Sequence, residues 1–220
     1  MATRQLLAEL VADYKKIAPT DIAIESVGGV DAAKRVQAGE AFDVVVLASD
    51  AIDKLIAAGH IDPTSKVNLV NSGVAVAIKK GAAQPDITSE SAVKAAVLAA
   101  KTLSYSTGPS GVALAKLFER WGIAEQIAKR IVQAPPGVPV GSLVAKGEVE
   151  LGFQQLSELI HLDGISIVGP LPPEIQITTT FSAGVRTASR QADAVREMLA
   201  YMASPAAAAA KLRQGMEIVQ

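Results

Sequence analysis

The feature that most constrains the fold of this chain is an alternation of β-type apolar runs with helical patterns, joined by short turns. Residues 22–27 (IAIESV) and 42–48 (FDVVVLA) are predicted strands, and helices are predicted over 31–38 and 51–59. A continuous apolar run such as 42–48 is typical of a strand buried on both faces. Because each strand is followed at once by a helix, the order predicts a parallel sheet.

A second series of the same kind follows a strand predicted at 72–81. Its predicted elements are, in order, a helix from Thr88-Ser89 through Ala100, a strand at 102–106, a helix at 110–121, a strand-like run at 127–134, a helix at 140–146 and a strand at 149–155. The chain then returns to the first series along a β-branched run at 176–186. It ends in a helical segment, 191–217, that is interrupted near Pro205.

The two series predict an α/β protein of two lobes with parallel-dominated sheets. Lobe one would consist of residues 1–78 and 180–220, and lobe two of residues 79–179, including the return crossing. The runs 72–79 and 176–186 would be the two strands that cross between the lobes. A further helix is predicted at the N-terminus, where apolar residues recur at helical spacing: Leu6, Leu7, Leu10, Val11 and Tyr14.

Composition excludes several classes of function. The chain has no cysteine and two histidines, which argues against disulfides, thiolate or histidine metal sites and a thiol nucleophile. Its net charge is −1 and aromatic residues make up 4%, so we expect no nucleic-acid partner. No apolar stretch approaches the roughly 20 residues of a membrane-spanning helix. We expect neither a metal nor a cofactor.

Four turns between a strand and a helix carry the candidate ligand-binding residues: 26–31, 104–111, 136–142 and 154–157. In an open parallel sheet, ligands bind beyond the carboxyl ends of the strands. A helix N-terminus placed there offers unpaired N–H groups and about half a positive charge. Several such turns together would form a neutral, donor-rich site for an anion.

Structural interpretations of the same turns stay open. Gly28 and Gly29 are also what a plain turn requires, and Ser110 is also a suitable helix N-cap, worth about 1 kcal/mol. The turn at 104–111 has more hydroxyls than capping requires. No histidine accompanies its serines in a catalytic motif, and no G-x-x-x-x-G-K-[ST] loop is present. His60 and His161 are interpreted as structural or surface residues.

In combination, these stretches resemble the periplasmic solute-binding proteins of ABC transporters, cluster II, close to the molybdate-binding branch. The resemblance rests on SVGGVDAAKRVQAGEAFDVVVLAS, YSTGPSGVALAKLFERWGI, GEVELGFQQLSEL and the segment that begins TTTFSAGVRTASRQADAV. It implies two α/β lobes joined by two β crossings. It also implies a periplasmic monomer that closes on a small anion in the inter-lobe cleft and delivers it to an ABC permease.

The ligand-binding residues that the resemblance implies are Gly28, Gly29, Val30, Ser106, Thr107, Ser110, Val138, Val140, Gln154 and Gln155. Three departures from the molybdate-binding pattern bear on the ligand. Gly28-Gly29 stands where a serine is usual, and Gln154-Gln155 replaces a typical tyrosine. The family also opens with a leader, a first strand and a serine-bearing turn, which we expect to precede Met1. An oxyanion or an organic acid is therefore expected, with molybdate itself in doubt.

An enzymatic alternative stays open because a sister branch includes aconitate isomerase, which moves a proton across an allylic tricarboxylate. Such a ligand would normally attract arginine or lysine, and the four turns contain none. Arg35, one turn into its predicted helix, and Arg186, after the crossing strand, are the arginines considered as able to reach the cleft, although both are expected at the surface. A third interpretation is a surface or scaffold protein that retains only a relic of the cleft.

Overall fold

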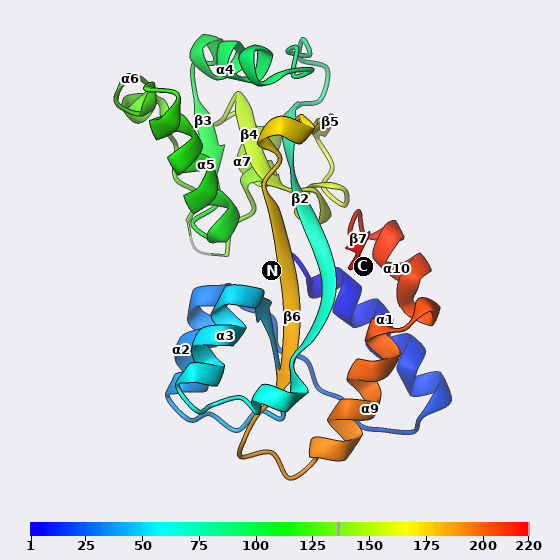
Figure 1. The fold of residues 1–220 in the computed structure, drawn as a ribbon. Helices are drawn as coiled ribbons and strands as arrows, with labels where there is room; N and C mark the ends of the chain where they lie inside the picture. Colours follow the sequence, from blue (N-terminus) through cyan, green and yellow to red (C-terminus); the bar gives the residue numbers. More distant parts are fainter. Residues whose placement is uncertain (136, 220) are drawn as a thin grey trace. The chain divides into compact units, whose positions relative to one another are not determined.

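The computed structural model describes residues 1–135 and 137–219, and the chain divides into two compact units. Unit 1 consists of Met1–Ser72 and Thr179–Gln220, and unit 2 of Gly73–Thr178. The chain passes from one unit to the other within strand β2 (Val67–Lys79) and at the start of strand β6 (Thr178–Val185) (Figure 1). No helix in the described part of the chain is long and apolar enough to cross a membrane.

Unit 1 is built on strands β1 (Val44–Ala48), β6 and the first half of β2. Strand β1 pairs antiparallel with β6, so that Val44 lies opposite Val185 and Ala48 opposite Phe181. The short strand β7 (Glu217–Ile218) pairs antiparallel with β2. The remaining elements of unit 1 are α1 (Arg4–Ile17), α2 (Gly29–Gln37), α3 (Ser49–Ala57), η1 (Pro63–Ser65), α9 (Ala192–Ala203), η4 (Pro205–Ala207) and α10 (Ala208–Arg213).

The core of unit 1 confirms the helical pattern predicted at the N-terminus. The residues buried along α1 are Leu6, Leu7, Leu10, Val11 and Tyr14. They pack in one cluster with Val195, Met198, Leu199 and Met202 of α9. Along both helices the apolar side chains recur every three or four residues and form one buried face. A second cluster joins Val36 of α2 with β1 and α3.

Unit 2 centres on β4 (Leu151–Gln155), which pairs antiparallel with β2 and parallel with β3 (Leu103–Tyr105). Strand β5 (Ile165–Pro170) pairs antiparallel with β2. The other elements of unit 2 are α4 (Glu90–Ala99), α5 (Pro109–Arg120), α6 (Ala124–Ile127), η2 (Ala128–Arg130), α7 (Val140–Lys146), α8 (Leu156–Leu159) and η3 (Pro173–Ile175). On one face of the sheet, Phe118 of α5 contacts the rings of Tyr105 and Phe153, with centroid distances of 5.9 and 6.2 Å. On the other face, a Cβ on Gly152 would lie 2.6 Å from Val144 Cγ2, so α7 packs directly against β4.

The α/β class is confirmed, but three expectations about strands are wrong. The β3–β4 pair is parallel, whereas β1–β6, β2–β4, β2–β5 and β2–β7 are antiparallel, so the sheets are not parallel-dominated. Residues 22–27 form no strand, and Ile24 is 41% exposed. Strand β1 instead pairs antiparallel with the long strand β6, and β4 pairs antiparallel with the long strand β2. Residues 127–134 end a helix and make one isolated bridge, Ile131 with Leu103.

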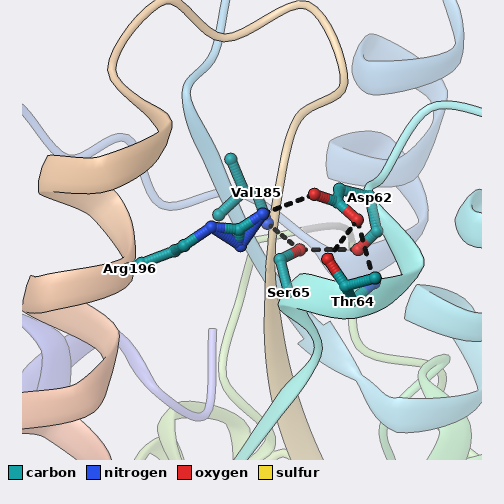
Figure 2. A network of polar contacts seen from close by, with 5 residues as sticks. All are labelled: Asp62, Thr64, Ser65, Val185 and Arg196. Carbon is teal, nitrogen blue, oxygen red and sulfur yellow. Dashed lines mark hydrogen bonds and ion pairs between the residues drawn. The ribbon is translucent and has the colours of Figure 1, made fainter.

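A polar network fixes η1 against β6 and α9 in unit 1 (Figure 2). The Arg196 guanidinium on α9 contacts Asp62 Oδ2 at 2.5 Å, and Asp62 Oδ1 accepts a hydrogen bond from the Thr64 N–H at 2.8 Å. Ser65 Oγ donates to the Asp62 carbonyl at 2.6 Å and accepts from the Val185 N–H at 2.8 Å. The hydrogen bonds from Thr64 and then the contact with Arg196 hold the pKa of Asp62 below its ordinary value.

Near the end of unit 2, the side chain of Gln176 forms hydrogen bonds with backbone groups of neighbouring segments. Its Oε1 accepts hydrogen bonds from the N–H groups of Val74 at 3.0 Å and Ile177 at 2.8 Å. Its Nε2 donates to the Leu171 carbonyl at 3.4 Å. A Cβ on Gly73 would lie 3.1 Å from this Nε2, so the glycine makes room for the amide. One side chain therefore connects β2 with the segment that leads into β6.

Candidate functional site

The turn between β3 and α5 folds back onto the first turn of the helix. A Cβ on Gly111 would lie 1.6 Å from the Ser106 carbonyl oxygen, so glycine is required there. Ser106 Oγ and Ser110 Oγ lie 3.1 Å apart and share a hydrogen bond, while Pro109 occupies the first helical position. Ser110 is buried and Thr107 is exposed. The turn therefore brings Ser106 and Ser110 together at the N-terminus of a twelve-residue helix.

In unit 2, four buried side-chain oxygens have no hydrogen-bond partner among the described residues. The atoms are Ser104 Oγ, Gln154 Oε1, Gln155 Oε1 and Ser157 Oγ, and each residue is at most 5% exposed. They lie in and just after the paired strands β3 and β4, since Ser104 is aligned with Gly152, two residues before Gln154. An unsatisfied buried polar group costs about 1–3 kcal/mol, so each of these oxygens is a candidate for contact with a ligand or with water.

Glu158 extends the group and was not found from the sequence. It lies in α8, four residues after Gln154 of β4, and its carboxylate accepts a hydrogen bond from the Gln154 amide. Burial is the largest influence on Glu158 and raises its pKa above the ordinary value. Gln154 Nε2 donates this bond, and Oε1 of the same amide has no partner among the described residues. The signal in the sequence was a glutamate four residues after the first of two consecutive glutamines.

The turn before α7 provides fewer donors than expected. The Val138 N–H donates to the Pro135 carbonyl at 3.0 Å, so this group is used within the turn. The Val140 side chain is fully buried, and a Cβ on Gly152 would lie 3.0 Å from its Cγ1. Val140 therefore packs the core. Pro136, which belongs to the turn predicted at 136–142, lies outside the described residues.

In unit 1, Gly28, Gly29 and Val30 lie together at the start of α2, beyond the carboxyl end of β1. A Cβ on Gly29 would be 3.8 Å from Leu47 Cδ2, and the Val30 side chain is 59% exposed. Asp31 follows in the first turn, and a Cβ on Gly28 would lie 3.6 Å from Asp31 Oδ2. This carboxylate competes with an external anion for the N-terminus of α2.

The two arginines considered from the sequence have other roles. Arg35 forms ion pairs with Glu25 at 2.7 Å and with Glu40 at 2.6 Å, which raise its pKa. Arg186 is 6% exposed, so the expectation that it lies at the surface is wrong. Since Val185 is aligned with Val44, Arg186 lies at the amino end of β1, opposite the end that approaches Gly29.

Comparison of the sequence with known proteins identifies one family and one curated relative. The model of the family described as bacterial extracellular solute-binding protein matches residues 1–217. An aconitate isomerase from a Pseudomonas species is 39% identical over 186 residues, which is 84% of this chain and 71% of that protein.

Comparison with solved structures confirms the expected type II periplasmic-binding-protein fold. The periplasmic molybdate-binding protein of Azotobacter vinelandii superposes with a TM-score of 0.81 at 20% identity, over 100% of this chain and 96% of that chain. A periplasmic thiamin-binding protein gives a TM-score of 0.76 at 17% identity, over 98% and 79% of the two chains. A ferric-binding protein from Campylobacter jejuni gives 0.72 at 12% identity, over 97% and 83%. At these identities the likeness shows the fold alone.

Proposed function

Because the chain belongs to the family of bacterial extracellular solute-binding proteins, we propose that it captures a small anion, an oxyanion or an organic acid, in the periplasm and delivers it to an ABC permease. The observations that carry the proposal are the buried oxygens of unit 2 without a partner among the described residues and the paired hydroxyls of Ser106 and Ser110 at the N-terminus of α5. A ligand that donates to the glutamine oxygens and accepts from the serine hydroxyls removes the free-energy cost of leaving them unsatisfied.

The binding chemistry uses neutral groups. Hydroxyls of Ser104, Ser106, Ser110 and Ser157 can donate to ligand oxygens, and the start of α5 adds the partial positive charge of its dipole. Gln154 Oε1 is an amide oxygen and only accepts, while the amide nitrogen of the same side chain is engaged with Glu158. A ligand that carries a hydroxyl or a protonated carboxyl therefore fits better than a fully deprotonated tetrahedral oxyanion. This chemistry favours an organic acid over molybdate.

Titration calorimetry tests the proposal with molybdate, tungstate, sulfate, citrate, cis-aconitate and trans-aconitate. We expect saturable binding of an organic acid, weakened roughly tenfold by Ser104→Ala and by Ser110→Ala, since each removes one hydrogen bond. Ser91→Ala, at an exposed serine of the same unit, is the matched control and should bind as the parent does. Unchanged affinity in both site variants would refute the assignment of the site.

A second candidate function, isomerisation of a small unsaturated polycarboxylate, is supported by the aconitate isomerase relative and by Glu158. A carboxyl whose pKa burial raises is suited to accept a proton from an acidified C–H and to return it at the other end of the allylic system. The ligand loses and regains one proton, so no oxidant or reductant is consumed. Hydroxyl donors beside Glu158 would stabilise the enolate-like charge.

Ultraviolet absorbance of cis-aconitate or trans-aconitate solutions, with a trace amount of protein, separates the two functions. An isomerase changes the absorbance until equilibrium is reached, and Glu158→Gln should slow this change by roughly 10²-fold or more while ligand still binds. A protein that binds an aconitate without changing its absorbance is a binding protein only. Equal turnover by Glu158→Gln and the parent would exclude Glu158 as the base.

A further inference from the structure

The turn between α8 and β5 contains the one aspartate of the chain that is followed by glycine, Asp163-Gly164. Asp163 is exposed, and Gly164 has a φ of 82°, a conformation that glycine adopts without strain. Because glycine has no side chain, nothing on Gly164 hinders the approach of the Asp163 carboxyl to its peptide nitrogen. The turn therefore places an exposed carboxyl next to an unhindered backbone nitrogen.

The two groups are not held apart by contacts with the rest of the described chain. The Asp163 carboxylate forms no hydrogen bond or ion pair with a described residue. The Gly164 N–H donates to none of the described residues, whereas the Gly164 carbonyl accepts from the Lys80 N–H at 3.0 Å. Since Asp163 Cγ and Gly164 N belong to adjacent residues, rotations within Asp163 alone bring them into contact.

Each of the other aspartates lacks part of this arrangement. Asp62 precedes a proline, whose nitrogen carries no hydrogen. Asp86 Oδ1 accepts two hydrogen bonds, at 2.9 and 2.7 Å. Asp21 and Asp43 precede β-branched residues, which crowd the peptide nitrogen. The aspartates held in helical backbone are Asp13, Asp31, Asp50, Asp53 and Asp193.

We propose that Asp163 is a site of spontaneous isomerisation to isoaspartate, through attack of the Gly164 nitrogen on the Asp163 side-chain carboxyl. A bond forms between Gly164 N and Asp163 Cγ, the nitrogen gives up its proton, and one carboxyl oxygen leaves as water. The product is a five-membered succinimide ring. Water then adds to one of its two carbonyls. Addition at the main-chain carbonyl of Asp163 breaks the bond from that carbon to Gly164 N, and the peptide link then passes through the side chain.

The reaction needs no partner, because one water leaves and one water returns. The mass and charge of the chain are unchanged, and nothing is oxidised or reduced. The main chain, however, gains one carbon atom between Asp163 and Gly164, since it now runs through Cβ and Cγ. The modification does not depend on the proposed function.

The extra atom falls where the fold has little room. Strand β5 begins at the next residue, Ile165, which lies opposite Lys79 of β2. A Cβ on Gly164 would lie 3.1 Å from the Ala145 Cβ, so the turn is already packed closely against α7. The lengthened turn cannot keep both contacts. We therefore expect isomerisation to break the hydrogen bond from the Lys80 N–H to the Gly164 carbonyl and to loosen the start of β5.

Prolonged incubation of the full chain at neutral pH in ¹⁸O-labelled water tests the proposal, with peptide mass spectrometry as the measurement. The peptide that contains Asp163 should take up one ¹⁸O atom, and electron-transfer fragmentation should identify part of it as isoaspartyl. Uptake in the peptides of the other aspartates should be at least roughly tenfold smaller, since their groups are less well placed. No uptake at Asp163, or equal uptake at all aspartates, would overturn the proposal.

Two substitutions separate this reaction from general ageing. Asp163→Glu should lower isoaspartate formation roughly tenfold or more, because the longer side chain loses more freedom in closing a six-membered ring. Asp193→Glu, at an exposed aspartate of α9, is the matched control and should age as the parent does. Parent-like formation of isoaspartate in the Asp163→Glu protein would refute the assignment.

Hydrogen exchange at the Lys80 amide measures the structural consequence. Exchange should accelerate in the aged parent in proportion to its isoaspartate content, and should stay unchanged in the aged Asp163→Glu protein. Unchanged exchange in an isomerised parent would contradict the expected loosening of β5.

Discussion

The Ser106 carbonyl oxygen occupies the space that a side chain on Gly111 would require, because a Cβ built on Gly111 lies 1.6 Å from that oxygen. The contact joins the strand-to-helix turn to the body of α5 and sets where Ser106 and Ser110 lie. Gly111→Ala would force the backbone of the turn away from the helix. We expect a loss of about 2 kcal/mol or more in the free energy of unfolding, measured with denaturant.

Gly108→Ala is the control for this turn. Gly108 has a φ of −79°, which alanine adopts freely, and a Cβ there would meet Ser106 Oγ at an ordinary 3.8 Å. We expect this variant to keep the parent's stability to within about 0.5 kcal/mol. If Gly108→Ala and Gly111→Ala destabilise equally, the close approach of Ser106 to Gly111 is not what fixes the turn.

Gln176→Leu should destabilise unit 2, because Gln176 Oε1 accepts from the Val74 and Ile177 N–H groups. Leucine has a similar volume and no acceptor, so the Ile177 N–H is left without that bond, while the Val74 N–H keeps the Ile177 carbonyl at 3.2 Å. We expect a loss of about 1–2 kcal/mol in denaturant unfolding. Gln126→Leu, at an exposed glutamine of α6, serves as the control and should change stability little.

Much of the fold was predictable because its signals are local. The spacing of Leu6, Leu10 and Tyr14 predicts the buried face of α1, and the apolar run at 42–48 predicts β1. Residues 127–134 were misassigned because Ile127 and Ile131 are four apart, a spacing that a helix satisfies as well. Residues 22–27 have a strand-like composition, but strand formation depends on neighbours that composition does not reveal.

The candidate sites were predictable only where the chain itself brings the residues together. Ser106 and Ser110 are four residues apart, and their contact follows from one turn and the first helical turn. The hydrogen bond from Arg186 to the Val36 carbonyl spans 150 positions, so the burial of Arg186 could not be read from local pattern. Glu158 was missed because its raised pKa comes from burial, which periodicity in a short helix does not indicate.

The burial of Glu158 predicts a pH dependence of stability. Its pKa is higher in the folded chain than in the unfolded chain, so folding favours its protonated form. The free energy of unfolding therefore decreases as the pH rises from the ordinary value of 4.5 through the raised folded value. We expect Glu158→Gln to be more stable than the parent at pH 8, with the difference shrinking towards zero below pH 4.5.

Thermal unfolding at several pH values measures this dependence, and Glu148→Gln, at an exposed glutamate before β4, is the matched control. The control should give the same difference from the parent at each pH. A stability gain of Glu158→Gln that grows as the pH falls would mean that the folded chain favours the ionised carboxylate, contrary to the effect of burial.

Ser65→Ala should weaken the network that holds η1 against β6. Ser65 Oγ is the acceptor for the Val185 N–H, and Ser65 is 4% exposed, so water cannot readily replace it. Alanine leaves a buried N–H unpaired, and the expected loss is about 1–3 kcal/mol in denaturant unfolding. Hydrogen exchange at the Val185 amide should accelerate by more than global destabilisation alone produces.

Thr64→Val is the control for Ser65→Ala. It removes a hydroxyl that donates to Asp62 Oδ1, but the Thr64 N–H still donates to the same oxygen. We therefore expect a smaller loss of stability, with the exchange of the Val185 amide unaltered relative to its neighbours. Equal effects of the two variants would show that the Ser65 hydroxyl has no special role in fixing β6.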